Sequence, residues 1–192
     1  MPWGKRYFFE GAGAGLLADY VQAVKEKENK AEKKAKKILK KQELRRHISE
    51  LNKMLQNYRA QPWKIRIDGN NISGRYILWQ AMNIRSVGPA LYRAPQAAIK
   101  DGRFDFVAVL EDDRSLLMKH FNARIAEKRA NFPLPMRRFR RLKILRKKST
   151  IHFDDDVWSD KNEKAKRSAK IEITVKPSAL VILEPKANRS VK

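Results

Sequence analysis

The sequence contains no cysteine, which excludes a disulfide framework, a thiolate metal site and a cysteine nucleophile. It has no apolar run near the roughly 18 residues that suggest a membrane span. Its first residues lack the apolar stretch and cleavage pattern of a signal peptide. Because a chain without disulfides suits a reducing compartment, we expect a cytoplasmic protein that is soluble or peripheral to a membrane.

Motifs of several common enzyme classes are also missing. The sequence has no Gly-x-Ser-x-Gly and no His-Glu-x-x-His, which argues against the corresponding hydrolases and zinc proteases. The three histidines are scattered, and only His152 borders a group of acidic residues. The Gly-x-Gly-x-Gly run at residues 11–15 lacks the rest of a dinucleotide fingerprint. We interpret it as a packing turn between a strand at residues 5–10 and a helix that begins at Leu16.

Positive charge is abundant, with 44 Lys and Arg against 21 Asp and Glu and a net charge of +23. Such an imbalance concerns partners rather than fold, and the two anionic candidates are an acidic lipid membrane and nucleic acid. Residues 25–46 carry eleven basic and four acidic side chains, and residues 137–148 carry eight basic side chains and no acid. Within the second segment the predicted anionic-surface residues are Arg137, Arg138, Arg140 and Arg141, although a solvated strand face would give the same pattern.

The hydrophobic pattern favours a mostly antiparallel β domain. Residues 63–67 alternate apolar and polar side chains, Asp68-Gly69 provides a turn, and residues 74–82 resume as a strand, which predicts a hairpin. Further strands are predicted at residues 104–110, 137–148, 151–153, 170–175 and 179–183.

The predicted helices lie between these strands. Residues 16–58 form one long helix or a helical pair, whose second half carries apolar residues on one face from Leu44 to Tyr58. A second helix follows Asp112-Asp113, which can cap it, and carries apolar residues at positions 117, 121 and 125. We therefore expect a domain at residues 1–185 with a helical insertion at residues 16–60, strongly basic at 25–46, and a basic tail at residues 186–192.

The stretch at residues 79–110 holds two prolines and the Asp101-Gly102 turn. Pro89 and Pro95 fix φ and extend the residue that precedes each of them. A tight turn that presents one carboxylate beside backbone carbonyls suits a hard cation such as Mg²⁺. The alternative is a loop that merely connects two core strands.

Asn83, Pro95-x-Ala97 and Asp101-Gly102-x-Phe104-Asp105 together resemble the C-terminal lobe of the diacylglycerol and sphingosine kinase family, which includes bacterial lipid kinases. Four further segments resemble this lobe in the same order along nearly the whole chain: residues 6–16 its opening strand and glycine turn, residues 68–69 its first hairpin turn, residues 153–156 the segment with Asp-Gly-Glu, and residues 171–185 its closing strand pair. The resemblance implies an antiparallel β-sandwich-like domain.

The resemblance also implies roles for individual residues. Asp101 matches a Mg²⁺-binding carboxylate, and the carbonyls of Ala98 and Arg103 match the backbone ligands beside it. Asp156 matches the Glu of Asp-Gly-Glu, which acts as the general base. An aspartate there is one methylene shorter, and a base must come within hydrogen-bond distance of the hydroxyl that it deprotonates. Asp155 replaces the glycine and removes backbone freedom.

In this family ATP is held by a separate N-terminal lobe with a Gly-Gly-Asp-Gly turn. This sequence has no Gly-Gly-Asp-Gly and begins about where the second lobe would begin. We therefore expect the lipid-substrate side of a lipid kinase, inactive alone, that uses ATP only if another lobe or chain supplies the nucleotide site. Its expected partners are an anionic lipid or membrane surface and such an ATP-binding chain. The alternative is a basic nucleic-acid-associated protein, although no established nucleic-acid motif is present.

Overall fold

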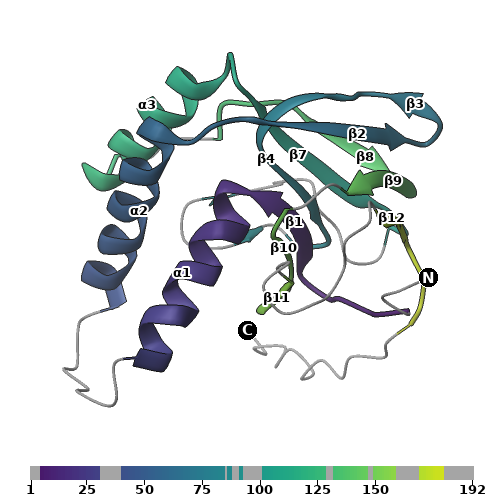
Figure 1. Cartoon of the computed structure of the whole chain (residues 1–192), viewed down its shortest axis with the longest axis horizontal. Helices are drawn as coiled ribbons and strands as arrows, with labels where there is room; N and C mark the ends of the chain where they lie inside the picture. The colour runs from purple at the N-terminus through teal and green to yellow at the C-terminus, as the bar shows by residue number, and fades with distance from the viewer. Residues whose placement is uncertain are drawn as a thin grey trace, which may run out of the picture.

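The computed structural model describes residues 5–30, 40–84, 86–87, 91–92, 101–128, 132–146, 149–158 and 169–179. Some features predicted from the sequence lie outside these residues, namely Pro89, Pro95, Ala98, most of the predicted strand at residues 179–183 and the basic tail. The described residues form an antiparallel sheet with helices on one side of it (Figure 1). The predicted fold class is therefore confirmed.

Strand β4 (Gly74–Met82) lies at the centre of the sheet because three strands pair with it. β1 (Gly11–Gly15) lies along one edge of its second half, and β7 (Phe104–Leu110) lies along the opposite edge. β2 (Gln61–Ile67) pairs only with the first three residues of β4. The sheet therefore branches at β4, and the hairpin predicted from the alternating pattern and Asp68-Gly69 is confirmed.

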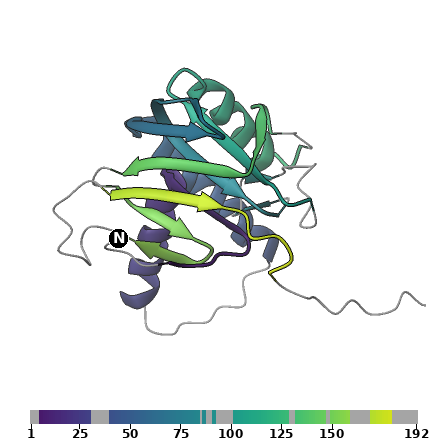
Figure 2. The same ribbon diagram turned by 90° about the vertical axis from the view of Figure 1, so that its right-hand side faces the viewer.

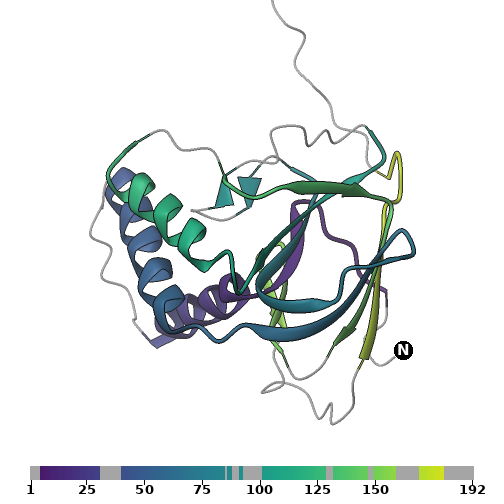
Figure 3. The same ribbon diagram turned by 90° about the horizontal axis from the view of Figure 1, so that it is seen from above.

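The remaining strands extend these branches. Beyond β2 come β9 (Arg141–Arg146) and then β12 (Ala169–Thr174), beyond β1 come β10 (Ile151–Phe153) and then β11 (Asp156–Trp158), and β8 (Met136–Phe139) pairs with β7. The sheet curls as it continues, so that it forms a half-barrel when seen from above (Figure 3), with β12 in yellow in front in the side view (Figure 2). The short strand β3 (Asn70–Asn71) pairs with β2. The short strands β5 (Ser86–Val87) and β6 (Leu91–Tyr92) pair with each other.

Two apolar cores lie on the two faces of β4. Successive side chains of a strand point to opposite faces, so Leu78 and Met82 join the core under the helices, whereas Trp79 and Ala81 join the core inside the curl of the sheet. Trp79 packs edge-on against Trp63 at 5.6 Å between ring centroids. β4 therefore carries apolar side chains on both faces because both faces are covered.

Helices α1 (Leu16–Lys30) and α2 (Lys40–Asn57) are separate elements that pack as an antiparallel pair. The Tyr58 hydroxyl donates a hydrogen bond to Asp19 at 2.6 Å, which joins the beginning of α1 to the end of α2. The single long basic helix considered above is not confirmed, because residues 31–39 between the two helices lie outside the described residues. The apolar face of α2 is confirmed, with Ile48, Leu51 and Leu55 buried.

Helix α3 (Arg114–Ile125) lies against α2 and buries Leu117 and Phe121, as predicted. Asp113 precedes it at the N-cap position, but its side chain does not cap the helix. Instead, the Asp113 carboxylate accepts the backbone N–H of Leu110 at 3.1 Å. The predicted capping bond is therefore wrong, because the carboxylate closes the turn that leads into the helix.

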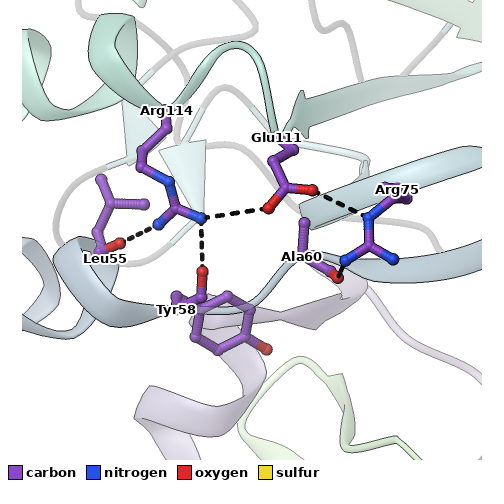
Figure 4. Close-up of polar contacts among 6 residues, drawn as sticks. All are labelled: Leu55, Tyr58, Ala60, Arg75, Glu111 and Arg114. Atoms are coloured by element: carbon purple, nitrogen blue, oxygen red, sulfur yellow. Dashed lines mark hydrogen bonds and ion pairs between the residues drawn. The ribbon is translucent and has the colours of Figure 1, made fainter.

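An arginine cluster fixes the end of α2 to the beginnings of α3 and β4 (Figure 4). Arg114 donates hydrogen bonds to the carbonyl oxygens of Leu55 and, at 2.6 Å, of Tyr58. Glu111 bridges Arg114 and Arg75 at 3.9 and 2.9 Å, and Arg75 donates to the carbonyl of Ala60 at 2.8 Å. The last carbonyl groups of a helix have no hydrogen-bond donor within the helix. At the end of α2 the Arg114 side chain supplies donors for such carbonyls.

The glycine run is not the predicted packing turn. Residues 11–15 form β1, which is buried along its whole length, and residues 5–10, the predicted strand, precede it without strand pairing. A Cβ on Gly13 would lie 2.2 Å from the Gln80 side chain, and a Cβ on Gly15 would lie 2.2 Å from the carbonyl oxygen of Ile77. Glycine is therefore required at position 15, where the close atoms belong to the backbone, whereas a side chain at position 13 would displace the Gln80 side chain.

Candidate functional site

Residues 8–11 contact the acidic turn at residues 154–156 that the sequence analysis singled out. The Asp154 carboxylate accepts backbone N–H groups from Phe9 at 2.8 Å, Glu10 at 2.8 Å and Gly11 at 3.0 Å. The backbone N–H of Asp154 donates in return to the carbonyl of Gly11 at 2.7 Å. Asp154 has a φ of 49°, a left-handed conformation that aspartate tolerates better than most residues. One carboxylate thus holds the β10–β11 turn on the segment that enters β1.

Asn83 and Phe104, the first residue of β7, contact the same segment. Asn83 donates its backbone N–H to the carbonyl of Glu10 and its side-chain amide to the carbonyl of Phe9, both at 2.9 Å. The ring of Phe8 stacks on Phe104 at 5.2 Å and contacts Phe153 at 6.4 Å between centroids. Phe104 begins β7 just after the Asp101-Gly102 turn, and Phe153 ends β10 just before Asp154. Asn83, the turn that carries Asp154 and the beginning of β7 therefore all contact residues 8–11.

The Asp101 carboxylate is exposed and accepts the backbone N–H of Arg103 at 2.9 Å. This bond holds the carboxylate at the mouth of its turn. Oxygen donors of this kind suit Mg²⁺, so the chemistry of Asp101 and of the Arg103 carbonyl fits the predicted cation, and Ala98 lies outside the described residues. Within the part of the chain that the structure describes, no group of three or more His, Asp or Glu side chains could hold a metal. A cation here would therefore depend on backbone oxygens and water as well.

Asp105 is a buried acid four residues beyond Asp101. It lies opposite Arg138 in the pairing of β7 with β8. Burial raises the pKa of Asp105, the Arg138 charge opposes that rise, and the Asp101 charge adds to it.

Asp156, the predicted general base, begins β11 opposite Phe153 and has an exposed side chain. The preceding Asp155 is also exposed, and its carbonyl accepts a hydrogen bond from the Lys25 ammonium of α1. The turn that carries Asp156 is thus held from two sides, by Lys25 and by the Asp154 contacts. An exposed carboxylate on a fixed turn is available to a hydroxyl group that approaches from solvent.

A buried polar pair lies beside this turn, and sequence reasoning missed it. His152 Nε2 and Gln80 Oε1 are 2.8 Å apart although the two residues belong to different strands, because Gly13 stands between them in β1 and has no side chain. Burial lowers the pKa of His152, although the Asp154 carbonyl and the charges of Asp154 and Asp155 oppose this. Among the described residues, Gln80 Nε2 has no hydrogen-bond partner. The feature of the sequence that could have indicated this pair is Gln80, a polar residue within the apolar strand β4.

The four arginines predicted to bind an anionic surface are placed on different parts of the sheet. Arg137 and Arg138 are neighbours in β8, so their side chains leave opposite faces of the strand. Arg140 and Arg141 lie at the corner between β8 and β9, where their backbone N–H groups donate to the Asp68 carboxylate. The structure brings Arg140 and Arg141 together, but it does not gather all four side chains on one face.

Among the helices described, none is both long and apolar enough to cross a membrane.

Comparisons with known proteins agree with this geometry. The profile of a family described as the YegS C-terminal NAD kinase beta sandwich-like domain matches residues 25–184. Two crystal structures of proteins assigned provisionally as diacylglycerol kinases, from Bacillus anthracis strain Sterne, superpose with TM-scores of 0.52 and 0.51 at 16% sequence identity. Each superposition covers 88% of this chain and 49% of the other, so this chain spans about half the length of those proteins. No curated protein matches the sequence.

Proposed function

The chain belongs to the family of YegS C-terminal NAD kinase beta sandwich-like domains, and from this premise we propose that it is the lipid-substrate domain of a diacylglycerol kinase-like lipid kinase. The observation that carries the proposal is that Asn83, the Asp154–Asp156 turn and Phe104, which begins β7 after the Asp101 turn, all contact residues 8–11. These segments are among those that resemble the lipid kinase family. Their meeting in three dimensions supports a shared role.

In this proposal Asp156 is the general base. Its exposed carboxylate accepts the proton of a lipid hydroxyl as the hydroxyl oxygen bonds to the terminal phosphorus of ATP, whose bond to the bridging oxygen breaks so that ADP leaves. Asp154 keeps the turn in place through its three backbone contacts, so the base does not lose its orientation when substrate arrives. The nucleotide is held by residues outside these 192 or by another chain, because phosphoryl transfer depends on a cradle for the phosphates. The 192 residues alone are therefore inactive.

The test of this role is transfer of phosphate from ATP to diacylglycerol. We expect no transfer by the isolated chain, and transfer once it is fused to the half of the Bacillus anthracis protein that it does not cover. In the fusion, Asp156→Asn should lower kcat by about a hundredfold or more, because an amide cannot accept the proton. Asp155→Asn, a change of equal size in the neighbouring exposed residue, should leave the rate within about twofold.

Two results would contradict the proposal. One is phosphorylation of diacylglycerol by the isolated chain above the level of a mock purification. The other is a fusion that folds and binds ATP but transfers no phosphate to diacylglycerol.

The Asp101 turn is the part of the site that would hold Mg²⁺, through the Asp101 carboxylate and the carbonyls of Ala98 and Arg103. A bound Mg²⁺ would supply a fixed positive charge at this turn. Binding to the folded state alone stabilises a protein by mass action, by about 1 kcal/mol when the ion exceeds its Kd fivefold. We expect Mg²⁺ to raise Tm by about 2–4 °C under that condition, and Asp101→Ala to abolish the rise.

The control for this prediction is Asp112→Ala, which removes an exposed carboxylate from the turn between β7 and α3. That variant should keep the full Mg²⁺-dependent rise in Tm measured by differential scanning calorimetry, with ionic strength matched by NaCl. A rise of equal size in Asp101→Ala would mean that Mg²⁺ does not bind at this turn.

A further inference from the structure

A basic cleft opens at the end of the sheet where β2, β9 and β12 lie side by side. Its volume is about 630 Å³, within the range of small-molecule sites. The tip of the β2–β3 hairpin forms one wall, the corner between β8 and β9 forms the second, and the end of β12 forms the third. The cationic side chains that line the cleft are Arg66, Arg140, Arg141 and Lys143.

Asp68, the acidic residue that lines the cleft, forms hydrogen bonds with backbone N–H groups. The Asp68 carboxylate accepts the N–H of Arg141 at 2.8 Å and that of Arg140 at 3.2 Å, and the Arg141 carbonyl accepts the N–H of Asp68 at 2.9 Å. These bonds lock the hairpin tip to the corner that carries both arginines. The cleft is therefore preorganised before any ligand binds, which lowers the entropic cost of binding.

The positive charges in the cleft are only partly compensated. Glu172 lies 3.1 Å from the Arg141 guanidinium and 3.9 Å from the Lys143 ammonium. Arg66 and Arg140 form no ion pair with any described residue. Moreover, Arg66 and Lys143 stand directly opposite each other on paired strands, an arrangement of like charges that destabilises a sheet. An anion between them would relieve this repulsion.

The lining also indicates which anion fits. Arginine guanidinium groups bind phosphate oxygens through paired hydrogen bonds, and the Thr174 side chain adds a neutral hydroxyl. None of the described residues that line the cleft is aromatic, so the cleft offers no surface on which a nucleobase could stack. We propose that this cleft, built on Arg66, Arg140, Arg141 and Lys143, binds a phosphate monoester, carried by a soluble metabolite or by a lipid head group. This proposal does not depend on the kinase role of the chain.

The decisive variant removes the two cations without an ion pair, Arg66→Gln together with Arg140→Gln. Both side chains are exposed, so the fold should be kept, as circular dichroism would verify. The matched control is Lys53→Gln together with Arg59→Gln, which removes the same charge from exposed positions in and just after α2. Calorimetric titration with glycerol 3-phosphate should show affinity at least about tenfold lower in the cleft variant, and within about twofold of wild type in the control.

Co-sedimentation with vesicles distinguishes the two sources of the phosphate. Phosphatidylcholine vesicles with phosphatidic acid present a monoester, whereas vesicles with an equal fraction of phosphatidylserine present a diester. Binding of glycerol 3-phosphate and of phosphatidic acid vesicles, both weakened by the cleft variant, supports the proposal with a lipid as the source. Binding of glycerol 3-phosphate alone supports it with a soluble source.

Three results would overturn the assignment. The first is no binding of either monoester probe, and the second is an equal loss in the cleft and control variants, which would indicate diffuse surface charge. The third is binding of single-stranded DNA that is tighter than that of glycerol 3-phosphate and lost in the cleft variant, which would assign the cleft to a nucleic-acid backbone.

Discussion

Replacement of Gly15 by alanine should destabilise the protein by about 2–5 kcal/mol. Gly15 has a φ of 85°, a conformation that costs a residue with a side chain about 1–2 kcal/mol. An added Cβ would also lie 2.2 Å from the carbonyl oxygen of Ile77 and 2.9 Å from the Cα of Leu78. These are backbone atoms of the paired strand β4, so the strands must separate, and such overpacking costs about 1–3 kcal/mol more. Urea unfolding monitored by circular dichroism measures the loss.

Gly69→Ala provides a matched control for this prediction. Gly69 has a similar φ of 90°, but a Cβ there would meet no atom within 4 Å. Its replacement should therefore cost only the conformational part, about 1–2 kcal/mol. If the two variants lose the same stability, the close contact between β1 and β4 does not determine the glycine at position 15.

Replacement of Asp154 by alanine should lower the free energy of unfolding by about 2–4 kcal/mol and release residues 8–11. The carboxylate accepts three backbone N–H groups, and hydrogen bonds to charged groups contribute about 1.5–3 kcal/mol each. Because Phe9 and Glu10 are exposed, water can bond to their N–H groups in the variant. The loss of stability is therefore smaller than the sum of three such hydrogen bonds. Hydrogen exchange at the amides of residues 9–11 should become faster in the variant.

Asp155→Ala tests whether this effect is specific to the anchoring carboxylate. The Asp155 side chain is exposed, and its contact with Lys25 uses the backbone carbonyl, which the substitution keeps. Stability should therefore change by less than about 0.5 kcal/mol, with unchanged exchange at residues 9–11. Slow exchange at those amides in Asp154→Ala would show that other contacts hold the segment.

The elements that the sequence predicted well are those whose pattern is local. The alternation at residues 63–67 and the Asp68-Gly69 turn identify a hairpin from a short stretch of sequence. The four-residue spacing of Leu117 and Phe121 identifies the buried face of α3 in the same way. Neither prediction requires knowledge of which distant segment covers the element.

The features that the sequence could not predict depend on strands that are distant along the chain. Glycine and alanine have low strand propensity, so β1 becomes a strand only because β4 and β10 pair with its two edges. The contact between Gln80 and His152 needs the register of both pairings at once. The basic cleft likewise combines Arg66 and Lys143, which meet only when β2 pairs with β9. The family motifs located Asp154, but not its role as the anchor of residues 8–11.

The position of β1 has a consequence for synthesis on the ribosome. The strand emerges before its partners, because the Asp154 that anchors the segment before it lies 145 residues beyond Phe9. Contacts between residues this far apart in sequence form slowly because a long loop must close first. Until those contacts form, the unpaired edges of the strand promote aggregation. The sequence Gly-Ala-Gly-Ala-Gly exposes little apolar surface during this interval. The small residues that let β1 fit between β4 and β10 thus also limit aggregation of the nascent chain before those two strands have been synthesised.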